Sequence, residues 1–516
     1  RSNLWHTAHA LQWMKNRLEL GSSKVTAIAG QKQPDGAIKV LAYAQDPSES
    51  FIRKGCINNF NKMTSCVDSI KQKLENALGR SVASCYVGIG GMGMHTVANT
   101  VTRHLGEKQL ITAEMVNNVK DSNNSMPGND REILEVIPQD YQLGTQVVAD
   151  PIGIASDVIE GHFLNIISNT SVSESVYNCF RSAHLNVVGM PITVLALADA
   201  ILTEPEKRSG CAFVDMGAET TSVAIFKNNI LRHFAVIPLG GANVNRDLCT
   251  LQIEDSEAEQ LKRKYATAYS NEEEDKHEPV TLGDGRTVKY EEFNGLVEAR
   301  MEEIILNIKH QIALSKYDDS KLVSGIVVTG GAANMKNIDK AFAAFTDFRK
   351  VRFVKNTRLQ TRLESKPSSS FNADGSFNAA IALIDKGEIN CCGGVIGQEG
   401  NAFEQQTQGG NVQTENDFSQ QGMQQTLAGT GQQGVQNVTI GGHQNAAQTQ
   451  TVAQGQQNGQ TTDVETEETS ERETKKPKQK SGMFGRISSI FKKVTNAAGN
   501  LVNDDDDRFM ASRKDK

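Results

Sequence analysis

The 516-residue chain is predicted to adopt an α/β fold, because it carries the same kind of turn twice and a third glycine element after an apolar strand. At residues 19–24 and 215–221, an acid is followed two residues later by glycine and then by hydroxyl residues. An alternating apolar segment follows each glycine, which is typical of the second strand of a β-hairpin. The third element, residues 325–332, is an apolar strand that ends in Gly330 and Gly331.

These turns favour the binding of an anion. A glycine lets backbone N–H groups approach an anion closely, and the hydroxyl side chains add further donors. An acid on the strand, here Glu19 or Asp215, holds a metal ion through water in such sites. Two turns of this kind predict one nucleotide clamp, although each glycine taken alone also fits a plain tight turn.

The composition limits the classes of protein to which this chain can belong. The length and the 38% hydrophobic content allow two or more domains with sizeable cores. A net charge of −7 gives no reason to expect nucleic acid as a partner. The eight cysteines are scattered, which favours reduced thiols inside the cell over a disulfide framework. No run of 18 apolar residues is present, and the first 17 residues lack the pattern of a signal peptide.

The chain changes character near its C-terminal end. Residues 18 to about 390 have the apolar periodicity of a globular body, whereas residues 387–481 are rich in Gln, Gly, Asn and Thr. A segment with so few large apolar side chains buries too little surface to offset its ordering entropy. We therefore predict a disordered linker over 387–481.

An amphipathic helix is predicted after this linker, over residues 482–503. Its apolar residues lie within one arc of about 120°, which is typical of a helix in a membrane interface. The alternative is that it docks on the globular body or on another protein. The residues expected to contact lipid are Met483, Phe484, Arg486, Ile487, Ile490, Phe491, Lys492, Lys493 and Val494.

The order of these motifs resembles the superfamily of actin, DnaK-type chaperones and sugar kinases, whose two halves close on ATP. More specifically, the chain resembles the FtsA family of bacterial cell-division proteins. The resemblance also covers residues 132–141, 151–153, 231–233, 236–238, 256–262 and 325–333, and the terminal helix after a tether.

The resemblance implies an actin-like two-lobed fold built from ribonuclease H-like repeats. The first lobe would comprise 18–83 and 166–203, and an inserted FtsA-type subdomain would comprise 84–165, with a polar loop over 117–130. The second lobe would comprise 204–245 and 325–386, and its smaller subdomain 246–324.

The resemblance also implies ATP and Mg²⁺ as ligands, with Asp215 near the metal ion. The residues that would hold the phosphates are Gly21, Ser22, Ser23 and Lys24 in the first turn and Gly217, Thr220 and Thr221 in the second. Gly330, Gly331 and Ala332 would approach the base and the α-phosphate, and Glu259 and Lys262 would reach the ribose or base. As alternatives, the glycines are structural and the Glu/Lys pair is a solvated ion pair.

Three features depart from the family pattern. Glu19 stands where most relatives have aspartate, and its longer side chain would shift a bridging water or metal ion. Ala218 and Glu219 replace glycines of the second turn, and the Glu219 carboxylate would face phosphate oxygens unless it turned away or paired with magnesium. Residues 1–17 contain no apolar strand that would lead into the first turn.

In function, the resemblance implies a bacterial adaptor rather than an enzyme. It would self-associate as a filament and tether the FtsZ ring to the cytoplasmic face of the membrane at the division site, with other division proteins as further partners. Its smaller subdomain would receive the FtsZ C-terminal peptide, with Arg300 as candidate contact; a solvated helical arginine is the alternative. No residue can be identified from the sequence as a catalytic base. The alternative functions are a scaffold like the pilus assembly protein PilM and an actin-fold ATPase or kinase.

Overall fold

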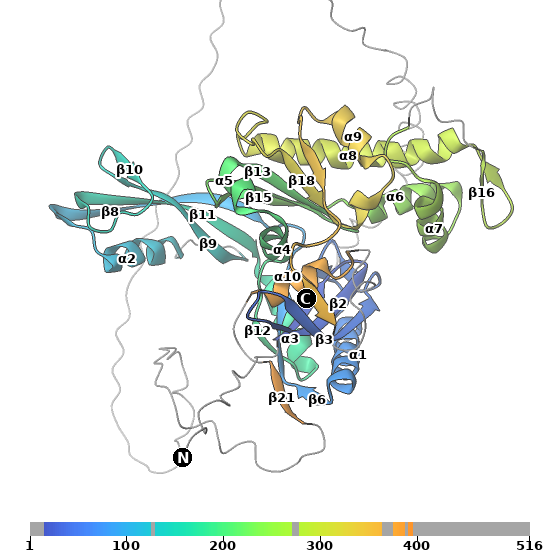
Figure 1. Cartoon of the computed structure of the whole chain (residues 1–516), viewed down its shortest axis with the longest axis horizontal. Coiled ribbons are helices and arrows are strands. Elements are labelled where there is room, and N and C mark those ends of the chain that lie inside the picture. Colours follow the sequence, from blue (N-terminus) through green and yellow to red (C-terminus); the bar gives the residue numbers. More distant parts are fainter. Residues whose placement is uncertain (1–14, 125–129, 271–277, 364–374, 387–390, 396–516) are drawn as a thin grey trace, which may run out of the picture. The chain divides into compact units, whose positions relative to one another are not determined.

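A computed structural model describes residues 15–124, 130–270, 278–363, 375–386 and 391–395 of the chain. The described residues form an α/β fold with two large sheets (Figure 1). This confirms the fold class expected from the two repeated turns. The six-stranded sheet has the order β12 (Asn186–Gly189), β7 (Ser84–Gly88), β1 (Lys15–Leu20), β2 (Lys24–Lys32), β3 (Ile38–Pro47) and β20 (Thr361–Leu363).

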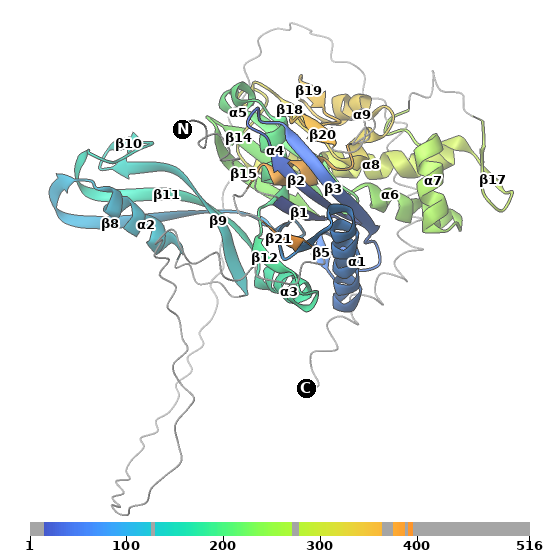
Figure 2. The ribbon, with the colours of Figure 1, turned by 60° about the horizontal axis from the view of Figure 1, so that its bottom comes forward.

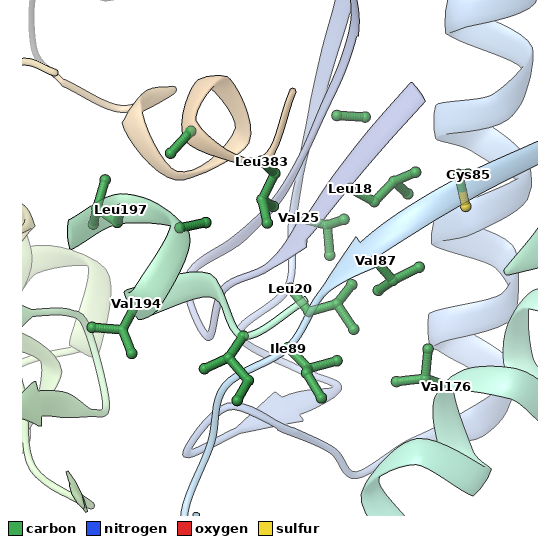
Figure 3. Packing of buried hydrophobic residues seen from close by; sticks show 14 of the residues in the cluster. Leu18, Leu20, Val25, Cys85, Val87, Ile89, Val176, Val194, Leu197 and Leu383 are labelled. Carbon is green, nitrogen blue, oxygen red and sulfur yellow. The ribbon is translucent and has the colours of Figure 1, made fainter. Parts of the chain in front are cut away.

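The first lobe is this six-stranded sheet with its helices. β1 and β2 pair antiparallel and form the first predicted hairpin, and β1 also pairs in parallel with β7. Figure 3 shows Leu383 close to Leu18 and Val25 of the hairpin, with Leu197 farther away; all four residues belong to one buried cluster. The other elements of the lobe are β4 (Ile52–Arg53), β5 (Cys56–Ile57), α1 (Phe60–Leu78), β6 (Arg80–Val82), α3 (Thr170–Ser182), α4 (Thr193–Ile201) and α10 (Asn378–Ile384).

The second lobe is built on β13 (Cys211–Met216) and β14 (Thr221–Lys227), which form the second predicted hairpin. Its sheet continues through β15 (Ile230–Ile237) on one side and through β18 (Ile326–Thr329) and β19 (Val351–Phe353) on the other. The remaining elements are α5 (Glu204–Ser209), α6 (Gly241–Leu248), η1 (Cys249–Leu251), α7 (Asp255–Tyr265), β16 (Val280–Thr281), β17 (Thr287–Val288), α8 (Tyr290–Leu314), η2 (Gly331–Asn334) and α9 (Ile338–Phe345).

The inserted subdomain is an antiparallel sheet that carries one helix. Its elements are β8 (His95–Leu110), α2 (Ala113–Asn124), β9 (Arg131–Leu143), β10 (Gln146–Val148) and β11 (Ala155–Asn169). Because His95 of β8 pairs with Ala235 of β15, the sheet of the insert is continuous with that of the second lobe (Figure 2).

The polar loop expected over 117–130 is wrong in its first part, since α2 extends to Asn124. The polar sequence misled the interpretation because a buried amide pair holds the helix in addition to the apolar contacts of Val119. Asn123 and Asn165 are both fully buried, and each amide nitrogen donates to the other side-chain oxygen at 2.8 and 3.0 Å. A buried polar pair with its hydrogen bonds made is tolerated in a core.

Three expected boundaries are corrected by strand pairing. The insert starts later than residue 84, because β7 pairs with β1 and β12 in the first-lobe sheet. The second lobe ends before residue 386, because β20 pairs with β3 and α10 packs on β1, β2 and α4. The linker starts later than residue 387, because β21 (Cys392–Val395) pairs with β6. Periodicity does not reveal such returns of the chain to an earlier sheet.

The absence of a strand leading into the first turn is also corrected. β1 begins at Lys15, and its first three residues are buried although all are polar. Arg17 is fully buried, donates from Nε to the Leu383 carbonyl at 2.8 Å and to the Lys386 carbonyl, and lies 3.6 Å from the centre of the Tyr86 ring. Lys15 and Arg17 therefore bind main-chain carbonyls at the C-terminal end of α10, where the helix dipole favours cations, whereas Asn16 donates to the Cys391 carbonyl.

The remaining tail predictions, the linker beyond residue 395 and the helix over 482–503 with its lipid-contacting residues, lie outside the described residues. Within the described part of the chain, no helix is both long and apolar enough to cross a membrane.

Candidate functional site

A large cavity of about 2080 Å³ lies between the two lobes, and both repeated turns line it. Of the residues predicted to hold the nucleotide, every one except Thr221 lines this cavity. Thr221 is fully buried, and its hydroxyl donates to the Leu239 carbonyl at 2.9 Å. The tertiary structure thus brings together the two turns and the Gly330–Gly331 element, which lie about a hundred or more residues apart in sequence, and adds Glu259 and Lys262 to them.

The two turns have the same backbone design. The Gly21 N–H donates to the Lys24 carbonyl at 3.1 Å, and the Gly217 N–H donates to the Thr220 carbonyl at 2.8 Å. A Cβ atom at Gly21 or Gly217 would lie 2.7 or 2.9 Å from that same carbonyl oxygen, which is too close. Both turns therefore require glycine at this position, and the following backbone lies against the cavity.

The two adjacent glycines after β18 have different roles. Gly330 has a φ of +98°, and a Cβ atom there would lie 2.4 Å from the Met216 carbonyl oxygen and 2.6 Å from Asp215 Oδ1. Gly330 therefore lets β18 pass closely behind the second turn. Gly331 has no atom within 4 Å of a would-be Cβ and lines the cavity. A side chain at Gly331 would therefore project into open space rather than into the protein.

Glu19, near the end of β1, and Asp215, near the end of β13, both line the cavity and interact through their charges. Burial, and then the nearby charge of Asp215, raise the pKa of Glu19 to about 7, while Lys24 opposes this shift. Burial raises the pKa of Asp215 to about 6. A divalent cation beside these oxygens would favour both charged forms, so the donor set fits Mg²⁺, which commonly uses one or two carboxylates together with phosphate oxygens. Among the described residues, no group of three or more His, Cys, Asp or Glu side chains forms a metal cluster.

The predicted ribose or base contacts, Glu259 and Lys262, form an ion pair at 2.5 Å within α7. Lys262 Nζ also donates to the Gly241 carbonyl at 3.0 Å, and Asn245 donates to Glu259 at 2.9 Å. Burial opposes ionisation of Glu259, but the hydrogen bonds from its partners outweigh burial and hold its pKa below the ordinary value. The pair therefore fixes α7 to α6 and at the same time lines the cavity.

The Glu219 carboxylate does not stand free against the cavity. The residue is 4% exposed, and its carboxylate accepts from Arg53, from the Lys54 N–H and from Arg246. The sequence predicted repulsion between phosphate and an unpaired Glu219 carboxylate. In the structure this carboxylate is instead paired with two arginines. Sequence reasoning missed Arg53, Lys54 and Arg246, because nothing local marks two arginines 193 residues apart as partners of one acid.

Arg300, the candidate partner contact, is engaged within the chain. Its Nε and Nη2 donate to the two carboxylate oxygens of Asp247 at 2.6 and 2.9 Å, and its Nη1 donates to Glu303. Hydrogen bonding and charge from Asp247 raise the pKa of Arg300. The side chain is 19% exposed, so its geometry is that of a clamp between α6 and α8. Its role in binding a partner stays a prediction.

Comparisons with known proteins agree with this architecture. Residues 212–381 match the family model for the cell division protein FtsA, and residues 91–167 match the model for the SHS2 domain inserted in FtsA. The chain is 28% identical to the cell division protein FtsA of Porphyromonas gingivalis over 328 residues, which cover 62% of this chain and 68% of the relative. It is also 28% identical to FtsA of Pseudomonas aeruginosa, over 62% of this chain and 78% of the relative.

A solved structure shares the fold alone. The PilM–PilN type IV pilus biogenesis complex aligns with a TM-score of 0.50 and 13% identity, over 72% of this chain and 98% of that one. The model for the inserted domain starts at residue 91, after β7 has joined the first-lobe sheet, so family match and strand pairing agree on where the insert begins. With the two repeated turns around one cavity and the insert in its expected place, the chain belongs to the FtsA family of cell division proteins.

Proposed function

We propose that this chain is a bacterial division adaptor that binds ATP between its lobes, self-associates as a filament and tethers FtsZ to the cytoplasmic face of the membrane at the division site. The observation that carries the proposal is the pairing of two matching glycine turns, one from each lobe, around a single cavity. A ligand that contacts both turns binds the closed arrangement better than an open one, and so shifts the population toward closure.

Particular residues would hold the nucleotide and its metal ion. The first turn, with Ser23 and Lys24, and the second turn, with Thr220, would contact the phosphates, and Gly331 would leave room for the base. Glu19 and Asp215 would hold Mg²⁺, which supplies positive charge between the two carboxylates and the phosphates.

ATP is proposed as a conformational ligand rather than as a substrate that is turned over rapidly. Among the described residues that line the cavity there is no histidine, and two of the acids, Glu219 and Glu259, are paired with basic side chains. Phosphate release by the bound protein at typical enzyme rates, about 1 to 1,000 per second, would contradict this part of the proposal.

The membrane contact is assigned to residues 482–503. Fully burying one large apolar side chain contributes roughly 1.5 to 3 kcal/mol, and a basic residue near an anionic surface about 1 kcal/mol. A single partly inserted helix therefore binds reversibly. Self-association would hold several copies together and multiply their weak affinities, which links the filament to the membrane role.

FtsZ recognition is assigned to the smaller subdomain, 246–324, and the other division proteins remain partners of the same adaptor. Arg300 lies on α8 of this subdomain, and its exposed fraction would be available to an acidic peptide only alongside Asp247 and Glu303. An Arg300→Ala variant that still binds FtsZ would confine this residue to its structural clamp.

The experiment that tests the adaptor is co-sedimentation of the full chain with anionic vesicles, with and without FtsZ. The wild type should carry FtsZ to the vesicles, and a variant with Ile487→Glu and Phe491→Glu should not. Ser488→Glu with Ser489→Glu is the matched control, because it adds the same charge away from the apolar arc. The control should retain most of the lipid binding.

Other outcomes identify the alternatives. If wild type and variants bind FtsZ but not lipid, the chain is a scaffold without a membrane role, similar to the PilM alternative. If none binds FtsZ or lipid and ATP is hydrolysed rapidly, the ATPase or kinase alternative replaces the adaptor. The likeness to the PilM–PilN complex concerns the fold alone and does not favour that alternative.

A further inference from the structure

The tip of a small first-lobe hairpin contacts both glycine turns at once. β4 and β5 are joined by Lys54 and Gly55, and these two residues present consecutive backbone N–H groups. The Lys54 N–H donates to Glu219 Oε2 of the second turn at 2.6 Å, and the Gly55 N–H donates to Ser22 Oγ of the first turn at 2.9 Å. One two-residue tip thus connects the turns of opposite lobes.

The backbone of this tip is fixed in place. Lys54 and Gly55 have φ values of +49° and +75°, the combination of a type I′ hairpin turn. A Cβ atom at Gly55 would lie 2.6 Å from the Cα of Gly91, so the tip rests directly on the loop that leads into the insert. The Met92 N–H also donates to the Lys54 carbonyl at 2.9 Å. These contacts with the Gly91–Met92 segment therefore help to hold the two N–H donors in position independently of Glu219 and Ser22.

Glu219 is the acceptor on the other lobe, and its carboxylate joins positive charge from both lobes. Arg53 Nη1 of the first lobe donates to Oε1 at 3.0 Å, and Arg246 of α6 in the second lobe donates to the same oxygen. The Glu219 side chain is 5% exposed. A carboxylate buried to this degree requires such partners, since burying a charge without them is costly.

Arg53 and Arg246 are also exposed to the cavity. Their side chains are 53% and 45% exposed, and both line the cavity between the lobes. A guanidinium group has five N–H donors and binds phosphate oxygens in a forked geometry. A polyphosphate in the cavity would therefore reach the same arginines that Glu219 holds from behind.

We propose that Glu219 is an interlobe latch: its carboxylate holds the Lys54–Gly55 tip and Arg53 of the first lobe against the second lobe, and a nucleotide polyphosphate in the cavity competes with it for Arg53 and Arg246. The latch closes the lobes without nucleotide, and bound polyphosphate replaces part of its charge. This inference goes beyond the proposed adaptor function and depends only on the cavity and its two turns.

The first test measures whether the latch closes the lobes in the absence of nucleotide. Hydrogen exchange of the full chain is followed in a peptide that contains residues 52–57. Glu219→Gln keeps the size of the side chain and removes its charge, so we expect exchange at least about tenfold faster than in the wild type. Arg53→Gln approaches the same contact from its exposed side and should act in the same direction, even if Glu219→Gln does not fold.

The matched control is Asp46→Asn. Asp46 accepts from Ser69 at 2.9 Å and pairs with Lys73, so all its partners lie within the first lobe. Its loss should leave exchange at 52–57 within about twofold of the wild type. Equal exchange in wild type, Glu219→Gln and Arg53→Gln would overturn the latch, and so would an equal increase in Asp46→Asn.

The second test measures the competition. Dissociation constants for ATP and for inorganic tripolyphosphate are determined by calorimetry. Glu219→Gln should bind both at least about tenfold more tightly than the wild type, because both arginines become available, whereas Arg53→Gln and Arg246→Gln should bind both more weakly. Affinities that are unchanged in all three variants would overturn the competition.

The two tests separate this inference from the proposed function. Faster exchange in Glu219→Gln supports the latch even if ATP does not bind. Failure of ATP and tripolyphosphate to bind any form would overturn the competition and the nucleotide part of the proposed function, but not the FtsZ and membrane parts. Normal ATP binding with unchanged exchange would overturn the latch alone.

Discussion

The hairpins β1–β2 and β13–β14 have the same hydrogen bond in their turns, but they bury side chains of opposite polarity at corresponding positions. Counted from the acid at the strand end, Arg17 of β1 stands where β13 has Phe213. Both side chains are fully buried. Phe213 is held by apolar packing, whereas Arg17 is held by carbonyls at the end of α10 and by the Tyr86 ring. A strand can therefore enter a core with a buried cation when a helix C-terminus supplies the acceptors.

The two turns also differ in the charge of the group that accepts a hydrogen bond from the Lys54–Gly55 tip. After the glycine, the first turn has Ser22, whose hydroxyl accepts from Gly55, and the second has Ala218 followed by Glu219, whose carboxylate accepts from Lys54. The neighbouring N–H groups of one tip thus bind a neutral oxygen in one turn and a charged oxygen in the other. The second turn therefore carries an anion of its own, whereas the first turn presents a neutral oxygen at the corresponding place.

The largest effect is expected when the buried cation of β1 is removed. Arg17→Met should lower the free energy of unfolding by about 3 kcal/mol or more, because it leaves the Leu383 and Lys386 carbonyls without this donor in a buried place. Phe213→Leu, the change at the corresponding position of β13, should cost only about 1 kcal/mol. Urea unfolding of both variants measures the difference, and equal costs would show that the two strands are held alike.

The next effect concerns the two glycines behind and beside the second turn. Gly330→Ala should cost about 2 kcal/mol and weaken ATP binding, since its φ is positive and its Cβ would collide with the Met216 carbonyl. Gly331→Ala has open space and should change stability by less than about 0.5 kcal/mol. Thermal unfolding of the pair provides the measurement. If both variants unfold alike, the close approach of β18 to the second turn is not the reason for Gly330.

A smaller effect is expected in the pH dependence of stability, to which Glu19 at the end of β1 contributes. It is measured in the presence of a chelator. The folded pKa of Glu19, about 7, exceeds its ordinary value of 4.5, so the folded state binds more protons than the unfolded state between these values. Stability should therefore be highest near pH 4.5 and fall as the pH rises to 7, by on the order of 2 kcal/mol more in the wild type than in Glu19→Gln.

Magnesium should reduce this loss, because a cation beside Glu19 and Asp215 favours their charged forms. The control is sodium chloride at matched ionic strength, which should restore little of the stability. A wild-type profile that parallels that of Glu19→Gln over pH 4.5 to 7 would contradict the raised pKa of Glu19.

The smallest effect concerns the neutral oxygen of the first turn. Ser22→Ala removes the acceptor of the Gly55 N–H and should cost about 1 kcal/mol. Ala218→Ser introduces a hydroxyl at the corresponding place of the second turn and should change stability by less than about 0.5 kcal/mol. Chemical denaturation monitored by circular dichroism distinguishes the two, and a neutral Ser22→Ala would remove the first-turn half of the tip contact.

Local pattern was enough to predict the α/β class, both hairpins and the glycine pair after β18, because turn chemistry and the alternation of apolar residues act over a few neighbouring positions. It also pointed to the glycine and hydroxyl residues of both turns, which line the cavity, because such residues mark turns of this kind in the chain itself. The resemblance then supplied the family, which the matches confirmed.

Tertiary structure alone decided the places where distant residues satisfy one another. Lys15, Asn16 and Arg17 form a strand because α10 and Cys391, more than 360 residues later, offer carbonyls to them. Glu219 is a buried acid because Arg53 and Arg246 meet there from different lobes. Periodicity reports which side of an element is apolar, but a buried charge depends on partners whose distance in space is set only when the whole chain has folded.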